Sequence, residues 1–177
     1  MRHQLLARSL AIAAIGFASC HSSTEPGNVP RATSIEVTPN PLVLKVAASQ
    51  QLGAAVKDQS GALLTGAAVT FTSGNTSVAT VTTSGSVTAV SLGSATITAT
   101  SGSVSTNVTV NTTADLVVTT TSFTLCGGAT QQISALLKDA TGAAVTGGPV
   151  SYASSNTSIA QVSSGGLITG GTTSGSA

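Results

Sequence analysis

Side chains that could do acid, base or nucleophilic chemistry are scarce in this 177-residue sequence. Beyond residue 20 the only histidine is His21, and the five acids are widely spaced. These acids are Glu25, Glu36, Asp58, Asp115 and Asp139. Glycosidase-type chemistry needs two carboxylates that converge to about 5 to 10 Å. Asp58 and Asp139 instead follow a lysine at equivalent positions of two internal repeats. We therefore interpret both as turn residues.

Metal binding and covalent catalysis find no support in the sequence either. Calcium prefers six or more oxygen ligands, several of them from carboxylates, and no local cluster of acids supplies them. Serine is abundant, but no Gly-x-Ser-x-Gly motif or histidine base accompanies it. We expect no enzyme activity, no metal and no cofactor.

Cys20 is the residue for which the sequence predicts a covalent modification. A basic start is followed by an apolar run over residues 9–18, which is typical of a secretory signal peptide. The end of this run and the two residues after it, Phe17-Ala18-Ser19-Cys20, resemble a bacterial lipobox, although Phe17 stands where that pattern usually has leucine. We expect a lipoprotein signal peptide over residues 1–19 and lipid attachment at Cys20. The alternative is ordinary signal cleavage that leaves Cys20 as a thiol.

The second cysteine, Cys126, aligns with Lys45 of the first repeat, so neither repeat contains a cysteine pair. We interpret Cys126 as a small, partly buried strand residue, with a Cys20–Cys126 disulfide as the alternative. Residues 20–32 have two prolines and no apolar period. That composition predicts an extended, solvated tether.

Composition favours an all-β fold and argues against nucleic acid as a partner. Charged residues make up 6% of the chain and aromatic residues 2%, while Val, Ala, Thr, Ser and Gly dominate. β-Branched residues fit a pleated sheet well. Without Arg2 and Arg8 of the signal peptide, the net charge of +1 becomes −1. A near-neutral surface has no counterion-release drive toward nucleic acid.

One module occurs twice in the sequence. Residues 73–81 reappear as residues 154–162, and at this offset of 81 residues 22 of the 56 pairs between 34–89 and 115–170 are identical. We expect a first module over residues 33–112 and a second, incomplete one over residues 113–177.

Short alternating runs separated by turn signals predict seven strands and no helix in the first module. The first strand is interrupted at Pro39-Asn40-Pro41, because proline cannot donate to a sheet ladder. Such spacing predicts an antiparallel sandwich of immunoglobulin type with Phe71 in its core.

The second module lacks the equivalents of two strands, because Gly175-Ser176-Ala177 aligns with Gly93-Ser94-Ala95. We expect an open core and an unpaired edge there. Tyr152 takes the aromatic core position, and Phe123 takes the place of the inward-facing Leu42. Both are therefore expected to pack inward, which disfavours a flat aromatic platform for sugars.

The order of motifs resembles the bacterial immunoglobulin-like domain of group 2. It runs from Ile-x-Val-x-Pro at Ile35 through Gln-Leu-x-Ala, Ser-x-Asn-x-x-Val-Ala-x-Val and Gly-x-Val-Thr-Ala to Gly-x-Ala-Thr-Ile-Thr-Ala, which ends at Ala99. Phe71 and Tyr152 stand where this family usually has tryptophan. The resemblance implies a non-catalytic β-sandwich of the cell surface or periplasm, as in intimin-like and invasin-like adhesins and in spacers.

These features together predict a non-catalytic exported lipoprotein that acts as a cell-surface spacer or adhesion module. Its lipid on Cys20 would hold it to the cell envelope, at the outer membrane or the cell surface, where a protein or a glycan could be its ligand. Two alternatives are a polysaccharide-binding module and the N-terminal fragment of a longer surface adhesin or enzyme.

Overall fold

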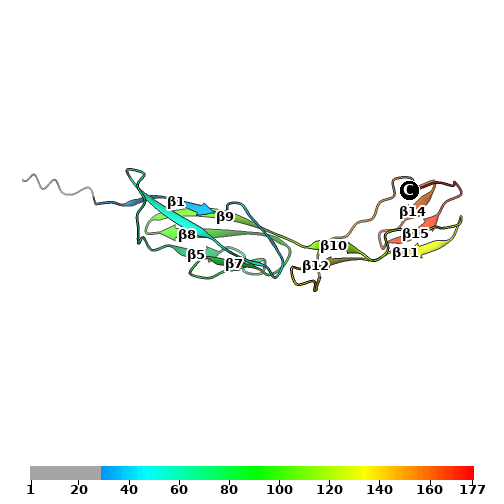
Figure 1. Ribbon diagram of the computed structural model, residues 1–177, viewed down its shortest axis with the longest axis horizontal. Coiled ribbons are helices and arrows are strands. Elements are labelled where there is room, and N and C mark those ends of the chain that lie inside the picture. Colours follow the sequence, from blue (N-terminus) through cyan, green and yellow to red (C-terminus); the bar gives the residue numbers. More distant parts are fainter. Residues whose placement is uncertain (1–28) are drawn as a thin grey trace, which may run out of the picture.

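The computed structural model describes residues 29–177, and the regular structure of this range consists of β-strands without a helix. The predicted signal peptide and the predicted tether up to residue 28 lie outside the described residues. The strands form two modules that follow each other end to end (Figure 1). The all-β fold class predicted from composition and alternation is confirmed.

The first module is a sandwich of two layers. Its strands are β1 (Ala32–Thr38), β2 (Leu42–Lys45), β3 (Ser49–Gln51), β4 (Gly53–Asp58), β5 (Thr70–Ser73), β6 (Ala79–Val81), β7 (Ser86–Ala89), β8 (Gly93–Ser101) and β9 (Val104–Thr113). One layer is a four-stranded sheet in the order β2-β9-β8-β5. The other layer combines the β1-β4 pair with the three-stranded sheet β3-β7-β6. The β2–β9 pair is parallel, and the other pairs are antiparallel.

Two of the predicted strands are each divided in two. The predicted break at Pro39 and Pro41 separates β1 from β2, so these two strands belong to different layers. Leu52 separates β3 from β4; its side chain is buried, and its amide donates a hydrogen bond to Gly85 O at 2.9 Å. The two halves thereby pair with different strands, β3 with β7 and β4 with β1.

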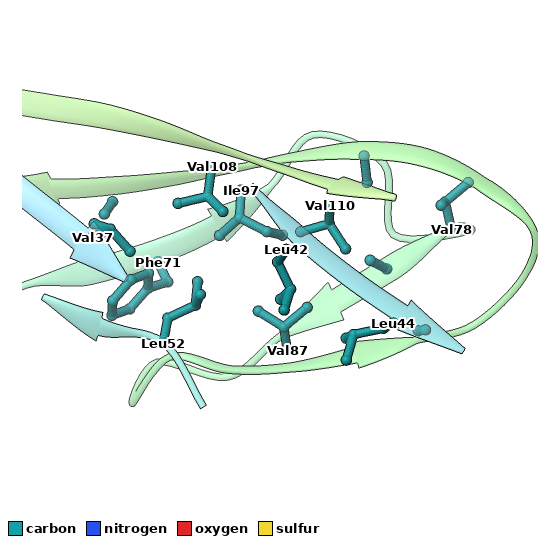
Figure 2. Packing of buried hydrophobic residues seen from close by; sticks show 14 of the residues in the cluster. Val37, Leu42, Leu44, Leu52, Phe71, Val78, Val87, Ile97, Val108 and Val110 are labelled. Atoms are coloured by element: carbon teal, nitrogen blue, oxygen red, sulfur yellow. The ribbon is translucent and has the colours of Figure 1, made fainter. Parts of the chain in front are cut away.

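The core of the first module lies between the layers. Alternation along β8 and β9 turns every second residue inward, so that Ile97, Val108 and Val110 are fully buried opposite Val87 of β7 (Figure 2). Phe71 packs into the same cluster at 9% exposure, which confirms its predicted core position. Complete burial of a side chain of this size stabilises a fold by about 1.5 to 3 kcal/mol.

The second module repeats one layer of this sandwich. Its strands are β10 (Asp115–Val118), β11 (Thr130–Gln132), β12 (Ala135–Lys138), β13 (Ala144–Val145), β14 (Ala160–Val162) and β15 (Leu167–Gly170). They form two three-stranded sheets, β10-β12-β13 and β11-β15-β14. At the 81-residue offset, β10 and β12 correspond to β1 and β4, and β11-β15-β14 corresponds to β3-β7-β6.

The four-stranded layer has no counterpart within the described part of the second module. Residues 123–126 and 151–154 align with β2 and β5 but lie outside the strands. In the first module β2 and β5 are held by β9 and β8. The buried hydrophobic residues of the described chain all lie between Ile35 and Val110, so the described part of the second module has an open core.

The two modules are joined closely. Ala114 alone separates β9 from β10. Beside it, Lys45 Nζ and Asp115 Oδ2 form an ion pair of 2.7 Å. Ala140 N, in a turn of the second module, donates a hydrogen bond to Val46 O of the first module at 3.0 Å. The two modules are therefore joined by a one-residue link, by an ion pair and by a backbone hydrogen bond.

Candidate functional site

Cys20, the predicted lipid attachment site, lies outside the described residues, as do His21 and Glu25. Lipidation of Cys20 therefore stays a prediction. Within residues 29–177, no helix has the length and apolar character needed to cross a membrane.

Asp58 and Asp139 are turn residues, as predicted. Asp58 Oδ1 accepts hydrogen bonds from Ser60 N at 2.8 Å, Ser60 Oγ at 2.6 Å and Ala62 N at 3.0 Å. The Ser60 hydroxyl does most to lower the pKa of Asp58, because it stabilises the ionised carboxylate. Asp139 accepts the equivalent bonds from Thr141 N and Oγ1 at 2.8 and 2.7 Å, and the Thr141 hydroxyl lowers the pKa of Asp139.

The other described acids each have a basic partner. Glu36 on β1 forms an ion pair of 2.7 Å with Lys57 on β4, and this hydrogen bond lowers the pKa of Glu36. Asp115 pairs with Lys45 at the junction. No group of three or more His, Cys, Asp or Glu side chains that could hold a metal ion occurs within residues 29–177.

The prediction that Cys126 is a partly buried strand residue is wrong. Its thiol is exposed, and the residue lies outside the strands. The aligned residue of the first module, Lys45, is an outward-facing position of β2, and β2 has no counterpart here. Cys126 O accepts a hydrogen bond from Ala129 N at 3.0 Å, which closes a turn before β11.

A cavity of about 650 Å³ opens on the second module. Its walls are the segments 121–125 and 151–154 together with β14 and β15, and residues 175–177 border it. In the first module the aligned residues face the core, and β8 and β9 occupy the space that is open here. We call this cavity the open face of the second module.

The apolar residues of the open face correspond to core residues of the first module. Leu125, Ile133, Ile159 and Ile168 align with Leu44, Leu52, Val78 and Val87. The four residues of the first module are buried, whereas their counterparts are half-buried. The open face is therefore the inner surface of one sandwich layer without the second layer on it.

Phe123 lines the open face, on the inner side as predicted, but it is not buried: it is 41% exposed, whereas Leu42 is 4% exposed. Leu42 is covered because it pairs with Val110 of β9, and the second module has no such strand in its described residues. Tyr152, in contrast, is anchored: its hydroxyl oxygen accepts a hydrogen bond from Ala135 N at 3.1 Å.

The duplicated loop before β14 holds one wall of the open face. Ser154 Oγ donates to Ala160 O at 2.6 Å and accepts from Asn156 N at 3.2 Å, and Asn156 Oδ1 accepts from Ser158 N at 3.1 Å. The first module has the same three bonds around Ser73. The loop thus keeps its geometry although the described part of the second module has no strands equivalent to β8 and β9.

Sequence reasoning found the open core but missed its organisation into a defined site. The open face is built from four separate segments, and only the alignment of these segments with β2, β5, β6 and β7 carried a signal for it. The contacts at the junction were missed too, because nothing local in the sequence marks Val46 or Ala140 as interface residues.

Comparisons with known proteins identify the first module. The family model of the bacterial Ig-like domain (group 2) matches residues 31–112. No curated protein matches the sequence. Domains 4 and 5 of the S-layer protein SbsC share 32% identity over 47% of this chain and 53% of that chain, so this chain spans about half of that structure, with a TM-score of 0.43.

Two further solved structures are similar over most of the chain. Domains 5–6 of SbsC share 22% identity over 80% of this chain and 85% of that chain, with a TM-score of 0.43. Human protocadherin-24 EC1-2 shares 18% identity over 82% of this chain and 79% of that chain, with a TM-score of 0.34. The family match and the sandwich topology of the first module together identify residues 31–112 as a bacterial Ig-like domain of group 2.

Proposed function

We propose that this protein is a non-catalytic exported lipoprotein whose Ig-like modules act as a spacer or adhesion module at the cell surface. Cys20 carries the acyl chains that hold it to the cell envelope, and residues 20–32 give the modules reach. The group 2 domain supports this proposal. The described acids also support it, because each is committed to a turn or an ion pair.

The junction between the modules is the observation that carries the spacer role. A one-residue link allows little separation of the modules, so the contacts beside it decide how freely one module reorients relative to the other. The exposed Lys45–Asp115 pair contributes at most about 1 kcal/mol. Packing adds to it: a Cβ placed on Gly148 would lie closest to Leu137 Cδ1 of its own module and 2.6 Å from Leu92 Cδ1 of the first module, so the Gly148 backbone lies close to the Leu92 side chain.

Distance measurements between spin labels test the spacer role. One label is placed on the exposed Cys126 and the other on Leu63→Cys, a 60% exposed position of the first module, in a chain with Cys20→Ser. We expect a narrow distance distribution. The matched control carries four Gly/Ser residues after Ala114, which should broaden the distribution. If the labelled chain without the insertion gives a distance distribution as broad as that of this control, the spacer role is refuted.

Metabolic labelling with palmitate tests the anchor separately. We expect labelling of the native chain, globomycin-sensitive processing, and loss of the label in Cys20→Ser. The native chain should then fractionate with membranes, and the variant should not. Unlabelled native protein would refute the lipid anchor and leave the spacer role to the distance measurements.

One observation favours a second candidate, a polysaccharide-binding module. Phe123 is 41% exposed and borders the open face, so its ring is available for stacking against a sugar. Tyr152 is less available, because its hydroxyl is bonded to Ala135 N. Glycan-array binding that Phe123→Ala abolishes would support this candidate, and an array without binding would remove it.

A further inference from the structure

We propose that Gln59 is a positioning residue that clamps the end of the predicted tether to the first module, so that the chain enters this module in one fixed direction. This role deepens the proposed function and rests on it, because a fixed direction of entry matters in a protein that holds its modules away from an anchor. The clamped segment is residues 29–31, the described residues before β1. Neither the lipid on Cys20 nor the second module takes part in the clamp.

The side-chain amide of Gln59 contacts the backbone of this segment as a neighbouring strand would. Its Oε1 accepts a hydrogen bond from Arg31 N at 2.9 Å, and its Nε2 donates a longer one to Val29 O at 3.5 Å. In an extended chain, residues two positions apart present their backbone groups to the same side. One amide group therefore holds a donor and an acceptor on one side of the segment, and the shorter bond has the usual length for N–H···O.

The clamp begins where the backbone ladder of β1 ends. Ala32, the first residue of β1, is paired with Asp58, the last residue of β4. Gln59 is the next residue along the chain and begins a turn that brings Leu63 back beside Lys57. The backbone after β4 thus leaves β1, and the side chain of Gln59 supplies the hydrogen bonds that the β4 backbone supplies further along.

The turn that carries Gln59 is fixed by its own hydrogen bonds. The Asp58 carboxylate accepts bonds from Ser60 N and Ala62 N, both of which follow Gln59. Asp58 N donates to Ala62 O at 2.9 Å, and Thr33 Oγ1 donates to Asp58 O at 2.8 Å. Because the backbone of Gln59 lies between these bonded residues, its side-chain amide is brought to one place beside the segment.

The segment is suited to being held by its backbone. Its three residues are exposed, Val29 to 67%, so packing against the core does not hold them. Pro30 favours an extended conformation at the residue before it. Pro30 also lacks an N–H, but it lies between the two residues that face Gln59, so the clamp loses no donor. The placement of the segment therefore depends on its bonds to Gln59.

The second module uses the equivalent turn position for the same purpose. At the 81-residue offset Gln59 aligns with Ala140, and the Asp139 turn has the same carboxylate bonds as the Asp58 turn. Ala140 N donates to Val46 O of the preceding module at 3.0 Å. A backbone contact is enough there, because a folded module precedes the turn. The first module is preceded by a single segment, and the longer glutamine side chain reaches it.

Distances between spin labels within the first module test the clamp. One label is placed on Val29→Cys and the other on Val43→Cys, a 60% exposed position of β2, in a chain with Cys20→Ser and Cys126→Ser. We expect a narrow distance distribution, and Gln59→Ala should at least double its width. Gln59→Asn keeps the amide on a side chain that is one carbon shorter, so it should broaden the distribution as well.

The matched control is Gln50→Ala, which makes the same chemical change on β3. The Gln50 side chain donates to the neighbouring Gln51 O, so this variant should leave the distribution unchanged. Hydrogen exchange followed by NMR gives a second readout, because Arg31 N donates to Gln59 Oε1. We expect the Arg31 amide to exchange at least fivefold faster in Gln59→Ala. The amides of β8 and β9 and the urea midpoint of the first module should stay unchanged.

Two results would overturn the proposal. The first is an equal width of the distance distribution with glutamine and with alanine at position 59. The second is a lowered urea midpoint with faster exchange throughout β8 and β9 in Gln59→Ala, which would make Gln59 an ordinary stabilising residue. Failure of the spacer role is distinguishable from both, because it broadens the distances between Leu63→Cys and Cys126 across the junction and leaves those within the first module unchanged.

Discussion

Leu52 and Ile133 occupy equivalent positions of the two modules, and replacing each by alanine measures what the four-stranded layer contributes to the stability of the first module. Both changes remove three carbon atoms from an aliphatic side chain. Leu52 is 2% exposed, so its truncation loses about 2.4 kcal/mol of transfer free energy at about 0.8 kcal/mol per carbon. A residual cavity in the closed core adds to this, and we expect about 3 kcal/mol in total.

Ile133 borders the open face and is half-buried. Truncating Ile133 loses only part of the transfer free energy, because the side chain is only half-buried. It also leaves no closed cavity, because solvent already reaches the site. We expect a loss of about 1 kcal/mol in the second module. The Leu52→Ala change should lower the melting temperature of the first module by about 12 to 24 °C, on the scale of 4 to 8 °C per kcal/mol for small domains.

Hydrogen exchange read by mass spectrometry across a urea series separates the two modules, because each gives its own peptides. The free energy of opening is compared between native chain and variant for residues 42–110 in Leu52→Ala and for residues 123–170 in Ile133→Ala. Equal losses at the two positions, each near 3 kcal/mol, would show that the second core is closed in solution and that the reasoning about the open face is wrong.

Three further predictions concern the first module. Gly85→Ala should destabilise it by about 1 to 3 kcal/mol in urea unfolding, because Gly85 has φ +90° and a Cβ there would lie 2.9 Å from Phe71 Cε2; Gly102→Ala, with φ +58° and open space, should cost less. Ser73→Ala removes the hydrogen bonds to Ala79 O and from Asn75 N and should cost about 1 kcal/mol, and an unchanged urea midpoint would argue against a role for the loop. The pKa of Asp58 is lower in the folded protein than its ordinary value of 3.8, so its stabilisation is complete above pH 3.8 and is lost as the pH falls through the folded pKa. The urea midpoint should therefore fall below that pH, less steeply in Asp58→Asn, and parallel curves for the two proteins would contradict this.

The alternation of residues was enough to predict the fold of the first module. In β8, apolar and threonine residues alternate with the period of a strand, and inward and outward positions follow directly from that period. The turn at Asp58 was predictable for the same local reason, because its carboxylate bonds to residues two and four positions later.

The second module shows where local reasoning fails. Phe123 was assigned to the core because it aligns with Leu42, but burial depends on a strand far along the chain, and alignment carries no information about whether that strand is present. The prediction that Cys126 is a partly buried strand residue is wrong for the same reason. The contact of Ala140 with Val46 is not predictable either, since it depends on how two folded units meet.

The parallel pairing of β2 with β9 has a consequence for a protein pulled between its two ends. The chain leaves β2 toward the N-terminus and leaves β9 toward the second module, so tension draws these strands past each other in opposite directions. The four residue pairs from Leu42–Val110 to Lys45–Thr113 are then loaded together in shear rather than one after another. A strand pair arranged in this way resists extension, and its lifetime under force is set by the rate of crossing the unfolding barrier.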